Sequence, residues 1–342
     1  MPILEQHEVA AYLLERCLLS RRSIVAGALR IGDASSRNRN VRVVGGEAGE
    51  SYLVKQGIVA DSAHTLANEA ALYRRLSRGG AALSASVPRL HGYDPTDGVL
   101  ILEWIAGGED LERVVADRGR CPPVLAAALG RALAAVHGVA RDGEELRDDA
   151  PWVLALHRPP LEALRYLSAG SIELVKRLQA DAALCGALDA LDEGWNAVAL
   201  VHRDVKWPNC IAHPAPGGAA RLTRVKLVDW EMAGWGDPAF DVGSALSDVA
   251  AFELDAGAGA ARPARAAFWR AYVRARGLDE RAAARLLERS VRYAGARLVQ
   301  SAYEHTQETT VMSRRVARVV ELARALLLLD GDAAAALLET GA

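Results

Sequence analysis

Three polar residues that follow apolar runs at fixed spacing constrain this chain more than any other feature of its sequence. Asp204 and Asn209 lie five residues apart in VHRDVKWPNC, directly after the apolar run AVAL. Asp229 follows a second apolar run, in VKLVDWE, twenty residues beyond Asn209. A lone Asp or Asn in a turn usually caps the backbone, but this ordered set of three between apolar strands favours a functional site.

The chemistry of the three side chains suits phosphoryl transfer. The spacing Asp-x4-Asn, followed by a strand that ends in Asp, is typical of the catalytic loop and metal site of kinases. Asp204 is the candidate to orient an attacking hydroxyl group and accept its proton. Asn209 and Asp229 offer amide and carboxylate oxygens, which are hard ligands suited to Mg²⁺. The spacing therefore predicts a magnesium-dependent kinase site.

These motifs resemble those of the aminoglycoside phosphotransferase and choline kinase-like family, whose fold is that of protein kinases. The resemblance covers about residues 23–247, and its most specific part is DWEMAGWGDPAFDVG, residues 229–243. It implies a nucleotide cofactor, ATP or GTP, with Mg²⁺ and a hydroxyl-bearing acceptor. The roles it implies are catalytic base for Asp204, magnesium ligands for Asn209 and Asp229, and structural braces for His202 and Asp241.

Two residues of the catalytic loop depart from the usual pattern of this family. Arg203 replaces the usual glycine and makes the motif HRD, as in protein kinases. Only seven residues separate Asp229 from Asp237, which is too few for an activation loop regulated by phosphorylation. Lys206 follows Asp204 by two positions, where a lysine can neutralise the γ-phosphoryl oxygens during transfer. We expect Arg203 and Lys206 to act with Asp204, although a solvent-facing loop lysine is the plain alternative.

Lysine is a rare choice in this chain, because only four of its 41 basic residues are lysines. Lys55 closes the strand-like run SYLVK, and Glu69 lies in the helical stretch that follows. Kinase chemistry needs a cation on the nucleotide phosphates that a helix carboxylate holds in place. Alone, a strand Lys and a helix Glu are usually surface residues. Together with the downstream motifs, Lys55 and Glu69 are expected to form this pair.

Two further segments are candidates to contact the nucleotide. No G-x-G-x-x-G motif is present, so the polar turn GDASSRNRN is the candidate to cover the triphosphate, with Ser36, Arg37 and Asn38. An ordinary polar hairpin turn fits this segment as well. Glu103 to Ile105 match the hinge of the family, whose backbone groups would pair with adenine.

The pattern of elements predicts an α+β, bilobal, protein-kinase-like fold: a small antiparallel-sheet lobe with one key helix, then a larger, mainly helical lobe. We place the first lobe at residues 1–105 and the second at 106–342. Expected elements are a helix at 4–19, strands at 23–31, 41–44, 51–55, 89–93 and 99–104, a helix at 61–78, helical stretches at 111–138 and 159–194, a β-rich island at 197–230, and helices from 239 onward.

Composition narrows the setting. A formal net charge of −2, with 51% hydrophobic residues, excludes a disordered chain and offers no general case for binding nucleic acid. Four scattered cysteines without a CxxC pair suggest neither a zinc site nor disulfides. Glu5, Glu8 and Glu15 interrupt the N-terminal apolar pattern, which argues against a signal peptide. A cytoplasmic protein without membrane contact is expected.

One feature bears on the acceptor. Four arginines recur at helical spacing near the C-terminus and form a basic stripe: Arg281, Arg285, Arg289 and Arg292. If it borders the acceptor cleft, the stripe would repel polycations and favour an acidic acceptor such as an acidic peptide. A solvated helix face is the plain alternative. The acidic segment EELRDD, residues 144–149, would instead suit a cation.

A weaker resemblance points to the kinase components of class V lanthipeptide and thioamitide peptide maturation, on the stretch DWE…GDP…DVG and the KW that follows HRDV. It implies phosphorylation of a Ser or Thr hydroxyl in a ribosomally made precursor peptide, ahead of dehydration by a partner lyase. A small-molecule kinase, acting on an aminoglycoside, macrolide, amino alcohol or sugar, is the first alternative. A pseudokinase that only binds is the second.

Overall fold

The computed structural model describes residues 4–25, 27, 29–34, 39–45, 51–57, 60–141, 146–215, 221–329, 333 and 334, with backbone only at 60–64. The chain forms two compact units. Unit 1 comprises Met1–Asp110 and Ile211–Glu231, and unit 2 comprises Leu111–Cys210 and Met232–Ala342. The segment 211–231 thus groups with the N-terminal sheet by contacts. The lobe limits expected at 1–105 and 106–342 stay a prediction.

Unit 1 is built on a five-stranded antiparallel sheet in the order β1-β2-β3-β5-β4. The central strands β3 and β5 are almost entirely buried, which the nearly continuous apolar run of β5 predicts. The strands are β1 (Arg30–Asp33), β2 (Arg39–Val44), β3 (Ser51–Gln56), β4 (Leu90–Asp94) and β5 (Val99–Glu103).

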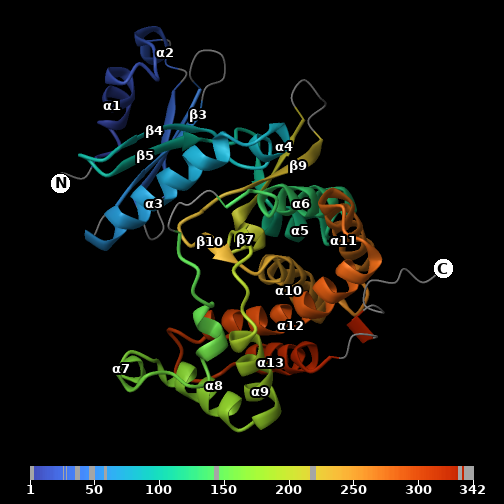
Figure 1. Cartoon of the computed structure of the whole chain (residues 1–342). Coiled ribbons are helices and arrows are strands. Elements are labelled where there is room, and N and C mark those ends of the chain that lie inside the picture. The colour runs from blue at the N-terminus through green and yellow to red at the C-terminus, as the bar shows by residue number, and fades with distance from the viewer. Residues whose placement is uncertain are drawn as a thin grey trace. The chain divides into compact units, whose positions relative to one another are not determined.

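Helices cover both faces of this sheet. Successive side chains of β3 point to opposite faces and so face different helices. Tyr52 lies in the apolar core that includes side chains of α1 (Val9–Glu15). Lys55, three positions further, faces the opposite side, where α3 (Ala60–Ser77) carries its partner Glu69. Figure 1 shows α3 running alongside β4 and β5, which it contacts. The period of two thus separates the core side chain from the functional one.

The strand expected at 23–31 is wrong in its first half. The structure has helix α2 (Arg21–Val25) there, and β1 begins only at Arg30. The hydroxyl oxygen of Ser20 accepts a backbone N–H from the first turn of α2, which favours helix over strand. Gly27 then adopts a φ of 66°, which is easy for glycine and ends the helix.

A second, three-stranded sheet in unit 1 has the order β6-β8-β9. Its strands are β6 (Glu109–Asp110), β8 (Cys210–Pro214) and β9 (Leu222–Leu227). A short helix, α4 (Ala81–Ser84), completes this unit. Because β9 ends at Leu227, it places Asp229 directly beyond a buried strand end, as the apolar run before it predicts.

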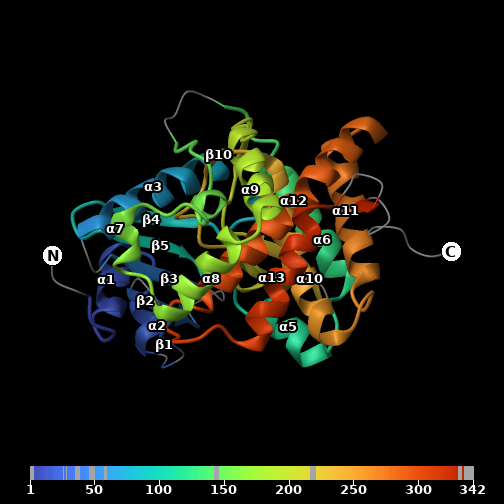
Figure 2. The same cartoon turned by 90° about the horizontal axis from the view of Figure 1, so that it is seen from below.

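Unit 2 is mainly helical, with one two-stranded sheet of β7 (Ala199–Val201) and β10 (Gly234–Gly236). Figure 2 shows α10, α12 and α13 side by side, and α11 packs on α6. Several helices begin at an Asp or Ser whose side chain accepts a backbone N–H. The helices are α5 (Leu111–Arg118), α6 (Pro123–Val136), α7 (Leu161–Leu164), α8 (Ala169–Gln179), α9 (Ala182–Glu193), α10 (Pro238–Ala256), α11 (Arg262–Arg276), α12 (Glu280–Glu304) and α13 (Arg314–Leu327).

The α+β class is confirmed: an antiparallel sheet with its helix in unit 1 and a mainly helical unit 2. In the part of the chain that the structure describes, no helix has both the length and the apolar character needed to cross a membrane.

Glycines allow close helix crossings in unit 2. A Cβ added to Gly130 of α6 would lie 2.4 Å from a backbone oxygen of α11. The corresponding distances are 2.5 Å from Gly243 of α10 to α12, and 2.7 Å from Gly295 of α12 to α13. Since backbone atoms cannot rotate away as side chains do, a methyl group at these positions would push the helices apart.

We expect Gly130→Ala to lower the free energy of unfolding by about 1 to 3 kcal/mol, through overpacking against α11. Gly186→Ala on α9 is the matched control, because no atom lies within 4 Å of the added Cβ. The control should be neutral or stabilising by up to about 1 kcal/mol, as alanine is the better helix former. Denaturant unfolding of the full chain measures both, and equal stability of the two variants would contradict this packing.

Candidate active site

Unit 1 brings together three of the residues expected to handle the nucleotide. Lys55 Nζ donates to Glu69 Oε2 at 2.9 Å and to Glu69 Oε1 at 3.1 Å. It also donates to Asp229 Oδ1 at 3.0 Å. The Lys55 side chain is 5% exposed and that of Glu69 is fully buried, whereas the Asp229 carboxylate is 38% exposed. One buried lysine therefore holds an accessible carboxylate in place.

Burial and charge act against each other in this cluster. Burial by itself would lower the pKa of Lys55, but the carboxylates of Glu69 and Asp229 outweigh it, and the pKa is raised. Burial raises the pKa of Glu69, and Lys55 offsets only part of that shift. The lysine therefore carries its full charge at neutral pH.

The backbone at Asp229 has an uncommon conformation. Its φ is 67°, in the left-handed region that Asp tolerates better than most residues. The next residue, Trp230, is buried, and its indole Nε1 donates to the carbonyl of Leu227 at 2.9 Å. This anchor fixes the turn after β9. Backbone strain of this kind clusters at functional sites, where the surrounding structure holds it.

The hinge segment, residues 103–105, lies at the end of β5. The N–H of Glu103 donates to the carbonyl of Arg89, and the N–H of Trp104 to the carbonyl of Ser51. Trp104 and Ile105 line a cavity of about 760 Å³ within unit 1. The backbone beyond the last sheet bond is thus at the wall of a cavity.

The Glu103 side chain has a partner that sequence reasoning missed. Lys226 on β9 donates to Glu103 Oε2 at 2.5 Å, and the N–H of Arg89 donates to the same oxygen at 2.9 Å. These bonds hold the pKa of Glu103 below its usual value, despite partial burial that would raise it. The scarcity of lysine was the available signal, and it marked Lys226 as much as Lys55.

The expected phosphate-covering residues Ser36, Arg37 and Asn38 lie outside the described residues. Their assignment stays a prediction.

Unit 2 holds the catalytic loop, with Asp204 at its centre. Asn209 Nδ2 donates to the backbone oxygen of Asp204 at 2.9 Å and to its Oδ2 at 3.0 Å. Lys206 Nζ lies 2.7 Å from Asp204 Oδ2. Arg297 of α12, which sequence reasoning did not select, donates to Asp204 Oδ1 at 3.3 Å. Three side chains therefore orient one carboxylate.

Asp241, a fully buried residue in the first turn of α10, holds the backbone of the catalytic loop. Its Oδ2 accepts the N–H of His202 at 2.6 Å, and its Oδ1 accepts the N–H of Arg203 at 2.9 Å. His137 Nε2 lies 3.2 Å from Oδ2, and Tyr272 Oη contacts the other ring nitrogen at 2.8 Å. Burial alone would raise the pKa of Asp241, but these bonds outweigh it and the pKa is lowered.

Arg203 has the contacts of a loop anchor. Its backbone φ is 67°, and its Nη2 donates to the carbonyl of Asp149 at 2.7 Å and to that of Trp235 at 2.8 Å. The guanidinium also lies 5.4 Å from the ring centroid of Trp195. The side chain thus ties the segment before η2 (Trp152–Ala155) to β10. Its expected catalytic role stays a prediction.

A second acidic residue of α10 was missed. Asp248 Oδ2 accepts the N–H of Trp207 at 2.6 Å and so contacts the catalytic loop. Burial raises the pKa of Asp248 to about 7. Asp241 and Asp248 are seven residues apart, which places them on the same helix face, and this spacing was the signal in the sequence.

The basic stripe is only partly available to a partner. Arg289 Nε and Nη2 each lie 2.9 Å from a carboxylate oxygen of Asp237, the buried N-cap of α10. Arg292 pairs with Glu288 at 2.8 Å. Arg281 and Arg285 are exposed. The structure therefore divides the expected docking residues into two that are exposed and two that already hold carboxylates.

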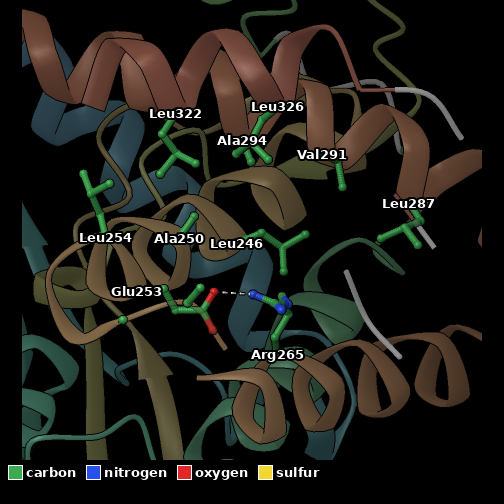
Figure 3. Close-up of a pocket in the computed structure, with 12 residues that line it drawn as sticks. Leu246, Ala250, Glu253, Leu254, Arg265, Leu287, Val291, Ala294, Leu322 and Leu326 are labelled. Carbon is green, nitrogen blue, oxygen red and sulfur yellow. Dashed lines mark hydrogen bonds and ion pairs between the residues drawn. The ribbon is translucent and has the colours of Figure 1, made fainter. Parts of the chain in front are cut away.

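A separate apolar cavity of about 370 Å³ lies within unit 2 (Figure 3). Its wall includes Leu246 and Leu254 of α10 and Leu322 of α13. The ion pair between Glu253 and Arg265, with 2.6 Å between carboxylate and guanidinium, forms its polar edge. None of the site residues predicted from the sequence lines this cavity.

Comparisons with known proteins agree with this geometry. A family model described as the phosphotransferase enzyme family matches residues 30–287. Among curated proteins, no sequence matches the chain.

Solved structures show the fold. A choline/ethanolamine kinase family protein from Mesorhizobium loti is 19% identical, with a TM-score of 0.54 over 95% of this chain and 98% of its own. Ethanolamine kinase from Plasmodium vivax is 12% identical, with a TM-score of 0.59 over 94% and 88%. Aminoglycoside phosphotransferase APH(4)-Ia, solved with ADP and hygromycin B, is 16% identical, with a TM-score of 0.51 over 94% and 98%. The expected kinase-like fold is confirmed.

The buried cluster in unit 1 makes a prediction about stability. Lys55→Met removes the cation from both Glu69 and Asp229, whereas Glu69→Gln leaves Lys55 its contact with Asp229. We expect Lys55→Met to cost about 3 to 5 kcal/mol of unfolding free energy, and Glu69→Gln to cost clearly less. Denaturant unfolding of the two variants and their double mutant measures this.

The double mutant should be less destabilised than the sum of the single variants, because the two groups interact directly. Lys176→Met, at an exposed position of α8, is the matched control and should be nearly neutral. Strict additivity, or a Glu69→Gln cost equal to that of Lys55→Met, would contradict the arrangement described.

Proposed function

The chain belongs to the phosphotransferase enzyme family and is an ATP-dependent kinase with a hydroxyl group as acceptor, and on this premise we propose which residues act and on what. Asp204 is the catalytic base. The observation that carries this role is the orientation of its carboxylate by Asn209, Lys206 and Arg297, on a loop that Asp241 fixes through two backbone bonds.

In the proposed reaction the acceptor hydroxyl donates its proton to the Asp204 carboxylate as its oxygen attacks the γ-phosphorus of ATP. The bond from that phosphorus to the β,γ-bridging oxygen breaks, and ADP leaves with the electron pair. Catalysis of this kind depends mostly on positioning and on neutralising phosphate charge. Lys206, which contacts Asp204, would neutralise the transferred group, and Lys55 would bind the α- and β-phosphates.

Magnesium fits the donor set of this chain. Among the described residues, no group of three or more His, Cys, Asp or Glu side chains suits a metal ion. Mg²⁺ is commonly held by one or two carboxylates together with substrate phosphates, so such a group is not required. Asn209 donates both of its bonds to Asp204 through Nδ2. Neither bond uses the amide oxygen, which is the atom that would bind a cation. Asn209 and Asp229 would hold the ion, which neutralises phosphate charge when bound.

For the acceptor, we keep a Ser or Thr hydroxyl of a ribosomally made peptide, phosphorylated ahead of elimination by a partner lyase. Its support is the HRD-x-K motif and the exposed pair Arg281 and Arg285. A small-molecule acceptor is the alternative, in line with the acceptors named for the structures of similar fold. The Lys55 cluster and the oriented Asp204 argue against a pseudokinase. The nucleotide is ATP, with GTP as the alternative donor.

The base assignment predicts that Asp204→Asn lowers turnover about 10²- to 10⁴-fold, because the proton acceptor is lost. Its Mg-ATP affinity should stay nearly unchanged, since Asp204 contacts the acceptor rather than the nucleotide. Asp229→Asn should give the reverse pattern, with loss of magnesium-dependent nucleotide binding. Calorimetry and coupled ADP release measure the two quantities, with the exposed Asp117→Asn as control.

Retention of more than a tenth of wild-type turnover in Asp204→Asn would remove it as the base. Unchanged Mg-ATP affinity in Asp229→Asn would remove that residue as a magnesium ligand.

The peptide acceptor makes a separate prediction about the exposed arginines. Arg281→Glu with Arg285→Glu should weaken binding of an acidic peptide roughly tenfold or more, because opposite charges become like charges. Wild-type affinity should fall with salt, since exposed charges are screened over about 8 to 10 Å. Arg289 is left intact because it holds the buried Asp237. Normal peptide binding by this variant, with rapid phosphorylation of an antibiotic or amino alcohol, would favour the small-molecule alternative.

A further inference from the structure

Arg297 is an unusual side chain beside the proposed base. It lies in the middle of α12, and its side chain is only 6% exposed. One of its terminal nitrogens, Nη2, donates to Asp204 Oδ1 at 3.3 Å. Its Nε and Nη1 are buried and have no hydrogen-bond acceptor among the described residues. Two donors of a buried cation are therefore unsatisfied next to the reacting carboxylate.

Among the residues that the structure describes, the charged groups near Arg297 do not satisfy its Nε and Nη1. Asp204 already has a cation in Lys206, which contacts its other oxygen at 2.7 Å. Asp248, the other carboxylate that Arg297 affects, accepts the N–H of Trp207 at 2.6 Å, and burial raises its pKa to about 7. The ring of Phe240 is a further neighbour, and its centroid lies 5.8 Å from the guanidinium carbon. None of these neighbours accepts a hydrogen bond from Nε or Nη1 of Arg297.

A guanidinium offers donors in a planar fork that matches a carboxylate, and such paired bonds are among the strongest in proteins. Leaving buried donors unsatisfied is unfavourable. A carboxylate at either edge of the guanidinium would bond one of these two donors together with Nη2, and so reduce this cost. A polycation or an amino alcohol would instead be repelled by the buried guanidinium.

We propose that Arg297 is an acceptor-binding residue and that it takes a carboxylate carried by the acceptor near the hydroxyl group that Asp204 deprotonates. The inference rests on the proposed function, because it needs Asp204 as the base. It narrows the acceptor to hydroxyl compounds with an acidic group. Such a carboxylate belongs either to a small hydroxy acid or to an acidic residue close to the Ser or Thr of a peptide.

The test compares acceptors that differ only in this charge. The small probes are glycerate, N-acetylserine and N-acetylhomoserine, each against its amide. The peptide probes are short capped peptides that contain Ser-Asp or Ser-Asn. Binding to the full chain is measured by calorimetry in the presence of Mg-ADP, which avoids turnover. Phosphorylation with Mg-ATP is measured in parallel.

We expect at least one acid to bind wild-type protein roughly tenfold or more tighter than its amide. Arg297→Gln should remove this preference by weakening the acid, with little change for the amide. Arg297→Lys, which keeps the charge but loses the fork, should recover part of it. Arg315→Gln, at an exposed position of α13, is the control and should keep the full preference.

Preference for the small acids would identify a free hydroxy acid, and preference confined to Ser-Asp would identify a peptide acceptor. No acid preference in wild-type protein would overturn the inference, and this comparison needs no variant to fold. Equal weakening of acid and amide in Arg297→Gln would also overturn it, since Arg297 would then only position Asp204. Failure of the proposed function is distinct, because it appears as full turnover in Asp204→Asn.

Discussion

The carboxylate of Asp241 is the interaction on which the catalytic loop depends. It is fully buried, and it accepts two consecutive backbone N–H groups, of His202 and Arg203, while His137 contacts it from α6. These bonds hold Arg203 at a positive φ and so set the direction in which the chain leaves β7. Asp204, the next residue, presents its carboxylate only because this backbone is fixed. A buried charge of this kind is stable only when it is fully hydrogen-bonded.

In unit 1 the buried charge that orients a functional residue is a cation. Lys55 is buried and holds two carboxylates, one buried on α3 and one accessible after β9. Coulombic attraction keeps the lysine charged although burial opposes it. Each unit thus contains an ion cluster in which a buried side chain contacts a more accessible carboxylate, Asp229 in unit 1 and Asp204 in unit 2. In the proposed kinase reaction, Asp229 would bind the metal ion and Asp204 would accept the proton of the acceptor.

The arginines of α12 have different roles in the structure from the one that their spacing in the sequence suggests. Their helical spacing predicts one basic helix face that attracts an acidic partner over a long range. In the structure, Arg289 pairs with Asp237, the buried N-cap of α10, and Arg297 contacts Asp204, the proposed base. In the proposed binding of the acceptor, the buried guanidinium of Arg297 would discriminate more sharply than the exposed arginines, because little water screens its charge.

The sequence by itself determined the α+β class and most of the order of the elements, because apolar periodicity is a local property. Motif spacing selected the candidate site residues in the same way, and their roles stay a prediction. The sequence pattern misplaced the start of the sheet, where the cap at Ser20 and the turn at Gly27 override the β-branched run. Only the tertiary structure decided that Lys226, Asp248 and Arg297 join the polar clusters, and that Arg289 is engaged with Asp237. These contacts join residues far apart in the chain, and whether a charged side chain is buried or exposed depends on which helices pack over it.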